Sequence, residues 1–450
     1  MTFGFKLPIT TPATITNQNG NNPCYAENPN LPNGHVYSSM TSRSVAGTQN
    51  IFIQRSHDWG DTWTEEQITF MTGGSTTGDQ YIGSLCPDLD GRGLHCFWYG
   101  KGYAEVGKTY YPSQKYSYSM LYAYRDAYGV WSGTQVIEYS RDHIYAIGYS
   151  RFRAVCHLKT PSAATDGNGD VHLSYIHYDT YNPYFLPGSA WDSIYYRKLD
   201  ISSGVWGDLA HFHFHGNGAT HCDFLSQNLQ VDYYGNPHIC AVILSPVNGW
   251  GYAYTTCWFM NPSGGDWTAW PGTQLAWDLH YYGGQLPVLT QYAELLYDTP
   301  ASGTPSYYCR MALSHFYDEG TFDYPHGIYL TPGGVFHKYM DVTGWHTERV
   351  NSISGSTYPT LALGKDGMIY ALTRALTQTN WEYRKKALPA DAWSDPETIL
   401  AVNYPRPVHH QFSIHYPLEG QDCSPFMAIH GGWAKLFRCG MPASGYGFFM

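Results

Sequence analysis

A short turn followed by an alternating strand recurs along this chain of 450 residues, at intervals of 53 to 76 residues. Its clearest copy is the turn at 166–170, followed by the strand pattern at 171–177. Apolar and polar residues alternate there with a period of two, and Asp, Asn and Gly bound the run, which is typical of an antiparallel strand after a tight turn. A repeat of this length predicts an array of small, similar sheets.

This opening turn can be found seven times along the sequence. The fifth copy, at 298–303, and the seventh, at 419–420, match the pattern least well. The spacing fits one four-stranded sheet per copy, with loops of variable length. The glycines of the seven copies are Gly34, Gly91, Gly167, Gly235, Gly303, Gly367 and Gly420.

A second turn, which ends in tryptophan, closes six of the seven units. In such a turn we expect the Asp carboxylate to accept backbone N–H groups, Gly to take a positive φ, and Trp to pack between neighbouring sheets. The fullest copy, at 56–63, resembles the Asp-box (BNR) motif of sialidase-like propellers, which joins the outer strands of a blade. The motif is structural and does not identify a chemistry. Looser copies are at 126–131, 200–206, 263–267, 341–345 and 391–393.

Together the two turns predict an all-β fold, a seven-bladed β-propeller of four-stranded antiparallel blades, with residues 1–450 as one domain. No linker or low-complexity segment interrupts the chain. An extended N-terminal segment is expected at 1–32. The blades are expected at roughly 33–70, 80–135, 157–208, 221–270, 285–347, 352–396 and 408–450.

The composition favours a sugar-facing or structural surface over a nucleic-acid-binding one. Aromatic residues make up 17% of the chain and charged residues 14%, against about 25% charged in an average soluble protein. The formal charge is −11, with 25 Lys and Arg, whereas phosphate contacts need clustered cations. We therefore expect a polysaccharide or oligosaccharide partner, with any anionic group bound in a local basic pocket. The sequence does not define an oligomeric state.

Location and redox state are only loosely constrained. No apolar run reaches the ~18 residues of a membrane span, and the first residues lack the features of a signal peptide. We expect an extracellular or virion-associated protein. The 10 cysteines show no close pairs, which excludes a CxxC-type zinc or redox site. Cys96, Cys156 and Cys240 fall in apolar strands and are expected to be buried free thiols, with disulfides as the alternative.

The repeat indicates where a ligand would bind. Counting back about ten residues from each opening turn reaches the start of an inner strand, which in a propeller lies at the mouth of the central channel. Polar or titratable residues stand at five of these starts, where core positions would be aliphatic. They predict one convergent pocket. The residues are Gln80, His157, His221, Tyr358, and His409 or His410.

Two further segments suggest contacts to an acidic sugar. Trp98 is expected to stack on a sugar ring while Lys101 pairs with a carboxylate; the alternative is a solvated lysine among packing aromatics. Arg151 and Arg153 alternate along an expected strand and so share a face, which predicts an anion clamp. Solvated surface arginines are the alternative.

Three histidines at alternate positions suggest a metal site. If 211–215 is extended, His211, His213 and His215 share one face, with about 6.7 Å between alternate residues. Zinc is the first choice, completed by residues from 221–223. The competing interpretation is a polar strand face whose phenylalanines are buried. A structural zinc or calcium ion is thus expected, and the chemistry requires no cofactor.

Tyr358 and Arg374 carry a second resemblance. The segment 356–374 is similar to the inner hairpin of propeller-type polysaccharide lyases, the ulvan lyases and their relatives, in which a Tyr-Pro start is followed sixteen residues later by Arg. The resemblance implies cleavage of a uronate-containing polysaccharide by β-elimination. In that role Arg374 would neutralise the carboxylate, and a Tyr or His would take the proton and return one to the leaving oxygen.

The sequence departs from that family at one place. Those lyases carry two histidines about twenty residues apart around an early inner hairpin, where this chain has Gln80 and Lys101. His157, His221 and His410 are the candidates to supply the base from other blades. Two alternatives stay open: a non-catalytic glycan-binding or structural propeller in a virion appendage or adhesin, and a glycoside hydrolase of the sialidase type, whose Arg-Ile-Pro start is absent.

Overall fold

The computed structural model of the chain consists of strands and their connections, and the residues that it describes contain no helix. It therefore confirms the predicted all-β class. The described residues therefore include no helix that is long and apolar enough to cross a membrane. The described residues are 24–27, 35–56, 64–72, 74, 78–88, 92–103, 118–139, 142–147, 150–180, 193–215, 223–232, 234–247, 251–260, 268–270, 278–281, 309–314, 324–331, 334–341, 344–351, 360–363, 368–374, 380–387, 392–401, 410–412, 426–430 and 434–438.

Within these residues the strands form seven antiparallel sheets, numbered here 1 to 7 in chain order. Five of them have four strands in simple sequence order. Sheet 1 comprises β1 (Cys24–Glu27), β2 (His35–Val45), β3 (Thr48–Ser56) and β4 (Thr64–Gln67), and sheet 2 comprises β5 (Gln80–Pro87), β6 (Leu94–Gly100), β7 (Ser119–Arg125) and β8 (Gln135–Glu138). Sheet 4 comprises β15 (Asp223–Val231), β16 (Pro237–Val247), β17 (Gly251–Met260) and β18 (Thr268–Trp270). Sheet 5 comprises β20 (Cys309–Ser314), β21 (Tyr324–Thr331), β22 (Gly334–Asp341) and β23 (Gly344–Asn351), and sheet 6 comprises β24 (Thr360–Leu363), β25 (Met368–Arg374), β26 (Asn380–Ala387) and β27 (Glu397–Ala401).

The other two sheets depart from four strands. Sheet 7 has three described strands, and sheet 3 has seven, because a distant segment, β19, adds to its edge. Sheet 3 comprises β9 (Asp142–Ile147), β10 (Ser150–Thr165), β11 (Val171–Thr180), β12 (Ser193–Asp200), β13 (Val205–Trp206), β14 (Ala210–His215) and β19 (Asp278–Tyr281). Sheet 7 comprises β28 (His410–Phe412), β29 (Phe426–His430) and β30 (Ala434–Arg438). The described strands therefore do not confirm the prediction that every sheet has four strands.

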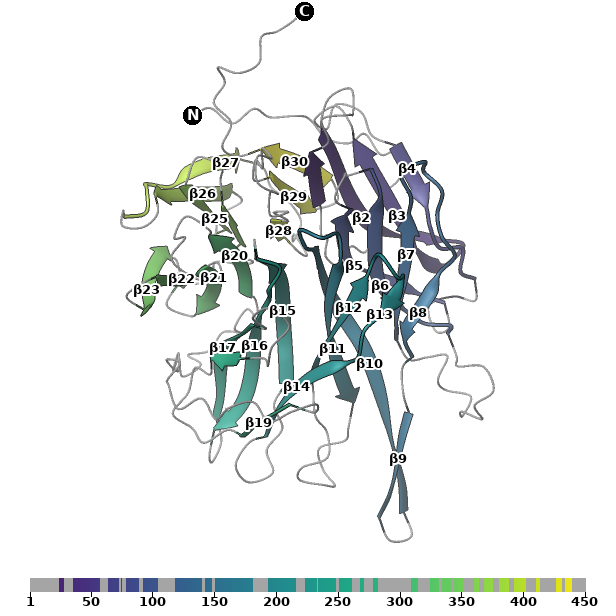
Figure 1. Cartoon of the computed structure of the whole chain (residues 1–450). Coiled ribbons are helices and arrows are strands. Elements are labelled where there is room, and N and C mark those ends of the chain that lie inside the picture. Colours follow the sequence, from purple (N-terminus) through teal and green to yellow (C-terminus); the bar gives the residue numbers. More distant parts are fainter. Residues whose placement is uncertain are drawn as a thin grey trace, which may run out of the picture.

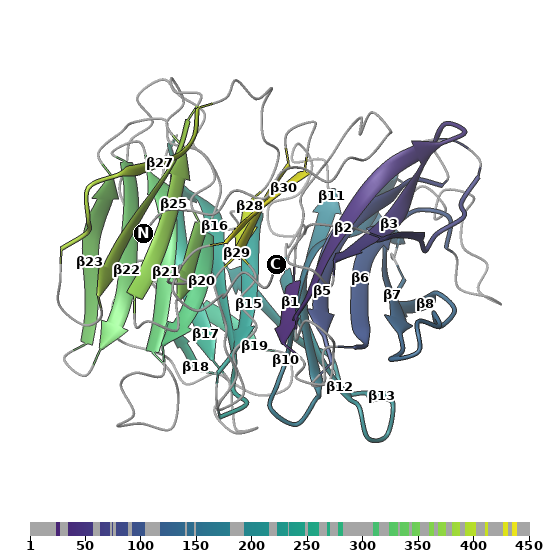
Figure 2. The ribbon, with the colours of Figure 1, turned by 90° about the horizontal axis from the view of Figure 1, so that it is seen from above.

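Successive sheets meet through their inner strands. β5 lies beside β10, β10 beside β15, β15 beside β20, β20 beside β24, and β24 beside β28. The last sheet, in yellow, lies between sheet 6 and sheet 1, so the two ends of the series come together (Figures 1 and 2). The sheets thus follow one another around an axis, which is a propeller-like arrangement.

Neighbouring inner strands run in the same direction. The amide of Ala163 donates to Oγ of Ser84 at 2.9 Å, and the hydroxyl of Thr165 donates to the carbonyl of Pro87, so β5 and β10 advance together. The amide of Leu229 likewise donates to Oγ of Ser162 at 2.9 Å, linking β15 to β10. We call the end at which these strands begin the entry end. A register irregularity recurs in these strands, at 81–84 in β5, 159–162 in β10 and 224–226 in β15.

The opening turns connect the inner strand of a sheet to the strand that follows it, β10 to β11 in sheet 3 and β15 to β16 in sheet 4. At Asp166 and Asp232 the turn is the same: the amide of each Asp donates to the carbonyl four residues on, and a glycine amide donates back to the Asp carbonyl. Gly169 and Gly235 have φ values of 90° and 84°, which only glycine adopts without strain. The fifth predicted copy, at 298–303, is wrong, because β20 follows that segment; the connection between β20 and β21 spans 315–323.

The closing turns connect the third and fourth strands. Oδ1 of Asp126 accepts the amides of Tyr128 and Val130 at 2.9 and 2.8 Å, as predicted for this turn. The predicted packing of tryptophan between sheets is confirmed at Trp206 of sheet 3, whose ring meets Tyr122 of sheet 2 at 5.7 Å between centroids. Residues 57–63 of the Asp-box segment lie outside the described residues.

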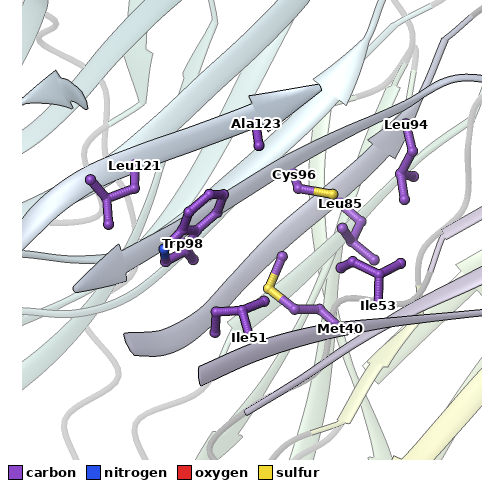
Figure 3. Close-up of a cluster of buried hydrophobic side chains, with 9 residues drawn as sticks. All are labelled: Met40, Ile51, Ile53, Leu85, Leu94, Cys96, Trp98, Leu121 and Ala123. Carbon is purple, nitrogen blue, oxygen red and sulfur yellow. The ribbon is translucent and has the colours of Figure 1, made fainter. Parts of the chain in front are cut away.

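Apolar side chains between adjacent sheets form the core. Cys96 and Cys240 are buried thiols that form no disulfide, as predicted, and the same holds for Cys86. Figure 3 shows the cluster between sheets 1 and 2, with side chains from β2, β3, β5, β6 and β7 pointing toward one another. Its members are Met40, Ile51, Ile53, Leu85, Leu94, Cys96, Trp98, Leu121 and Ala123.

Two sheets start earlier than the expected blade boundaries. β1 lies inside the segment 1–32, where it pairs with β2 and completes sheet 1. β9 and the first part of β10 lie before residue 157. These two strands form a hairpin that extends away from the other sheets (Figure 1).

Candidate functional site

Three tyrosines gather at the entry end of sheet 2. Tyr81 of β5 lies opposite Tyr99 of β6, and Tyr118 comes directly before β7. Directly opposite residues share one face of a sheet, so the rings of Tyr81 and Tyr99 stack, with centroids 5.3 Å apart. The ring of Tyr118 meets both edge-on, at 5.1 and 5.6 Å. All three side chains are half-buried. We call these residues the tyrosine cluster.

A lysine and an aspartate flank the tyrosine cluster. Lys101 follows β6, and its Nζ lies 5.1 Å from the ring centroid of Tyr118, within the range of a cation–π interaction. Asp79 precedes β5; its carboxylate accepts the hydroxyl of Tyr81 at 3.3 Å and the amide of Gln49 at 2.9 Å. The backbone carbonyl of Asp79 accepts the amide of Lys101 at 3.0 Å. The lysine is thus fixed relative to the aromatic rings.

Gln80 supports this arrangement from the other face of the sheet. Its Nε2 donates to the carbonyls of Gly78 and Lys101 at 2.8 and 3.0 Å. Its Oε1 accepts the indole N–H of Trp98 at 3.0 Å. A Cβ at Gly100 would meet the Gln80 side chain, so glycine makes room for it. Gln80 therefore positions the backbone that carries Lys101.

The hydroxyls of Tyr81 and Tyr99 are held in their protonated form. Burial, followed by the hydrogen bond with Tyr118, raises the pKa of Tyr81 far above its usual range. Burial, followed by the proximity of Tyr118, also raises the pKa of Tyr99. At neutral pH these hydroxyls therefore donate hydrogen bonds and do not act as bases.

More aromatic side chains lie across the boundary with sheet 3. The ring of His177 stacks on Tyr195 at 4.8 Å, and Tyr175 meets Tyr195 edge-on at 5.6 Å. Tyr99 and Tyr195 pack against the same core cluster. The tyrosine cluster therefore lies where sheets 2 and 3 meet.

This arrangement suits a sugar. Tyrosine offers an apolar ring face together with a hydroxyl, and a sugar has apolar C–H faces and hydroxyl edges. The ammonium group of Lys101 adds a charge that attracts a carboxylate or sulfate. This combination of ring faces, hydroxyls and one ammonium group suits the binding of an acidic sugar.

Gln80, Trp98 and Lys101 were predicted to bind substrate, and the structure brings them together. However, Gln80 and Trp98 are each 0% exposed. Trp98 belongs to the core between sheets 1 and 2, so in this conformation neither its ring face nor the amide of Gln80 is open to a sugar. Lys101 is half-buried, and of the three it alone has solvent-exposed surface.

The predicted anion clamp lies on the projecting hairpin. Arg151 is opposite Ala146 and Arg153 is opposite Ile144, so the two arginines occupy one face of β10. His157 lies further along β10. The side chains of these three residues are outside the described part of the structure, and their role stays a prediction.

The other predicted catalytic residues are described only in part. Arg374 is the last residue of β25, and His410 is the first of β28. Both positions are at the end of their own sheet where the inner strand begins, which corresponds to the entry end of sheet 2. Tyr358 and His221 lie outside the described residues.

The segment with His211, His213 and His215 is β14, so the predicted extended conformation is confirmed. The side chains described in the structure contain no group of three or more potential ligands arranged around a metal. The side chains of β14 are outside that set.

Sequence reasoning missed the main part of this site. Tyr81 and Tyr118 were not among the predicted site residues, nor was Tyr99. A signal was available: Tyr81 directly follows one predicted strand start, and Tyr99 directly precedes the Gly-flanked Lys101. Their contact depends on the pairing of β5 with β6 and on the start of β7, which are not readable from the sequence alone.

Known proteins resemble this chain in three-dimensional structure, whereas no protein-family model and no curated protein matches its sequence. The chain is similar to polysaccharide lyase Uly1, with a TM-score of 0.47, 11% identity, and 90% of this chain and 87% of that chain covered. It is similar to the GH93 α-L-arabinofuranosidase of Fusarium graminearum, with a TM-score of 0.43, 11% identity and coverage of 83% and 93%. It is also similar to the sialidase of Trypanosoma rangeli, with a TM-score of 0.39, 8% identity and coverage of 92% and 53%.

Proposed function

We propose that this protein is a carbohydrate-active seven-bladed propeller that binds an acidic polysaccharide at the entry end. The observation that supports this most directly is the tyrosine cluster with Lys101 beside it. Half-buried rings offer stacking surface at low entropic cost, since their positions are already set by mutual packing. The ammonium group accounts for a preference for acidic sugars.

We propose β-elimination as the reaction. A base takes the proton on the carbon next to the carboxylate, the electron pair forms a carbon–carbon double bond, and the bond to the leaving oxygen breaks as that oxygen takes up a proton. Lys101 and Arg374 are the two cations that we propose to neutralise the carboxylate. They occupy comparable places, directly after β6 in sheet 2 and at the end of β25 in sheet 6.

The raised pKa of Tyr81 and Tyr99 keeps both protonated, so neither of them serves as the base. His157, His221, His410 and Tyr358 remain the proposed candidates. The same observation also favours a second function, a non-catalytic glycan-binding propeller, in which the cluster binds sugar and no proton is taken.

One experiment separates these functions. The full chain is incubated with ulvan, pectin, alginate, plant gums and glycosaminoglycans while the ultraviolet absorbance of an unsaturated uronate product is followed. Binding to the same panel is measured by calorimetry. Absorbance growth supports the lyase, and binding without it supports the glycan-binding protein. If no acidic glycan is bound or cleaved, the proposed function is wrong.

The variant Lys101→Met connects the function to this site. Loss of a charged hydrogen-bond donor is expected to weaken binding of an acidic glycan by about 10- to 100-fold. Lys385→Met, on β26 of sheet 6, is the matched control and should bind as the wild type does. Equal binding by both variants would contradict a role for the tyrosine cluster.

A further inference from the structure

Strand β19 joins sheet 3 from far along the chain. It comes after the whole of sheet 4 in sequence, yet it pairs with β14 at the edge of sheet 3. The pairing sets His213 opposite His280, and His215 opposite Asp278. All four residues are of types that bind transition metals.

Strand geometry puts these four residues on one face. Residues directly opposite in an antiparallel pair share a face, with Cβ atoms about 4.5–5.5 Å apart. Residues two apart in one strand also share a face, about 6.7 Å from each other. His213, His215, Asp278 and His280 therefore form a two-by-two block on the ribbon of β14 and β19. His211 continues the same face of β14 toward β12, opposite Tyr195.

The residues at the alternate positions of the β14–β19 ribbon are apolar or aromatic. Phe212 lies opposite Tyr281, and Phe214 lies opposite Leu279. In the paired segment, one face of the ribbon therefore has only apolar or aromatic residues, and the other has His213, His215, His280 and Asp278. A face that is merely solvated has no requirement for histidine at each of three positions, whereas a metal site does.

We propose that β14 and β19 bind one zinc ion through His213, His215, Asp278 and His280. Three histidines and one carboxylate make up a four-coordinate set of the kind zinc accepts. Calcium is disfavoured because it takes oxygen ligands. Such an ion would hold β19 at the edge of sheet 3. It would thus explain why the chain comes back to sheet 3 after completing sheet 4.

This site differs from the one that the sequence predicted. There, His211, His213 and His215 were completed by residues from 221–223, next in the sequence. The register of β14 with β19 instead supplies Asp278 and His280. The site is independent of the proposed glycan function.

The test uses the full chain after removal of metals with a chelator. Zinc titration followed by elemental analysis should give one tightly bound zinc per chain. Loss of an outer-shell partner of a metal ligand weakens metal binding by about 10- to 100-fold. His280→Ala removes a proposed direct ligand and should weaken zinc binding by more than that. Asp278→Asn, which keeps the side-chain shape, should weaken it as well. His346→Ala, a half-exposed histidine of sheet 5, is the control and should retain full zinc binding.

Cobalt substitution identifies the ligands of the wild-type chain without relying on any variant. A tetrahedral cobalt spectrum that lacks a thiolate charge-transfer band supports nitrogen and oxygen ligands. A thiolate band would mean that cysteines bind the metal and would overturn the proposal. So would the absence of tight zinc binding in the wild type, or unchanged binding in both the His280 and the Asp278 variants.

Discussion

Glu66 and Arg125 form a two-point ion pair across the boundary between sheets 1 and 2. Nε of Arg125 lies 3.0 Å from Oε2 of Glu66, and Nη2 lies 2.8 Å from Oε1. The indole N–H of Trp131 donates to the same carboxylate. Glu66 is on the outermost strand of its sheet, and Arg125 is on the third strand of the next. The pair therefore joins neighbouring sheets near their outer side.

Two other boundaries use the same arrangement. Arg197 of β12 lies 3.0 Å from Glu138 of β8, and Lys386 of β26 lies 2.8 Å from Glu348 of β23. The indole of Trp393 also donates to Glu348, at 2.9 Å. In each case the carboxylate belongs to the last strand of one sheet and the cation to the strand that precedes the closing turn of the next. We call each such carboxylate–cation pair a joint between sheets; at two of the three boundaries the closing-turn tryptophan also donates to the carboxylate.

Arg125→Met should destabilise the fold by about 1–3 kcal/mol, because Glu66 would stay partly buried without its counter-charge. Urea unfolding of wild type and variant at neutral pH measures the difference. Arg349→Met provides the control, since Arg349 is exposed and lies over the ring of Phe336; its cost should be within about 0.5 kcal/mol. Equal costs for the two variants would mean that the joint does not stabilise the fold.

The joint between sheets 5 and 6 should be sensitive to mild acid. Nδ1 of His326 lies 3.1 Å from Nε2 of His337, and Nδ1 of His337 lies 2.7 Å from Glu348. Burial, followed by the proximity of His337, lowers the pKa of His326. Burial also lowers the pKa of His337, although Glu348 opposes the shift. The unfolded chain therefore binds more protons, and stability falls as the pH drops through 6.5, the ordinary value of histidine.

Urea unfolding at a series of pH values measures this effect, which amounts to about 1.4 kcal/mol per pH unit for each histidine. His326→Asn, which retains a donor near the position of Nδ1, should reduce the loss below pH 6.5. His346→Asn should leave it unchanged, since that ring is part-exposed and bonded to Asp341. The idea is untenable if His326→Asn has the pH dependence of the wild type.

The joint between sheets 1 and 2 should respond only to stronger acid. Burial raises the pKa of Glu66, but hydrogen bonds from Arg125 and Trp131 outweigh it, and the pKa is lowered. A lowered carboxyl pKa contributes stability that is lost only as the pH falls below the ordinary value of 4.5. Hydrogen exchange should therefore show β23 and β26 losing protection at a higher pH than β4 and β7. Simultaneous loss would contradict this order.

Gly83→Ala should destabilise the fold by about 1–3 kcal/mol or more, the usual cost of forcing extra atoms into a packed site. A Cβ at this position would meet the backbone carbonyl of Phe97 and the ring of Pro161 on the next inner strand. Gly133→Ala is the matched control, because a Cβ there meets nothing within 4 Å. Thermal unfolding compares the two, and a similar midpoint for both would show that the inner strands can separate at no cost.

Asp166→Ala should cost more than Asp126→Ala, although both carboxylates accept two backbone amides in the same kind of turn. Asp166 also accepts from Nε2 of His172 at 3.1 Å and from Lys198 at 3.2 Å. Burial raises the pKa of Asp166, but the hydrogen bond and charge of His172 outweigh burial and bring it to about 2.

We expect about 0.5–1.5 kcal/mol for the exposed turn and about 2–4 kcal/mol for the buried one. The unfolding free energy of each variant at neutral pH gives these values. Because the pKa of Asp166 is lowered, the stability that its carboxylate contributes should persist down to pH 3.8. It should disappear only as the pH falls toward about 2. An equal cost at both sites would show that the contacts to His172 and Lys198 contribute nothing.

The site was less predictable than the fold because its residues meet through packing. Trp98 and Lys101 were chosen as polar or aromatic residues near a strand end, but the pleat sends Trp98 into the core between sheets 1 and 2. Tyr99, one residue further on, takes the opposite face and stacks on Tyr81. A single step along the strand thus decides between core and site.

The local chemistry of the turns follows from the order of the residues alone. An Asp carboxylate that accepts amides two and four residues on, and a glycine with positive φ, act within five residues, so the pattern is visible without knowing what lies nearby. This is why the all-β class, the antiparallel strands and most turn positions could be predicted. The fifth turn could not, because its pattern has decayed.

Which residues meet across sheets depends on how the sheets assemble. Glu66 and Arg125 are 59 residues apart, and His213 faces His280 only because β19 returns to sheet 3. Such contacts depend on strand register and on the packing of one sheet against the next. A shift of one residue in register would turn every side chain of a strand to its other face, so contacts of this kind follow from the assembled fold and not from any local pattern.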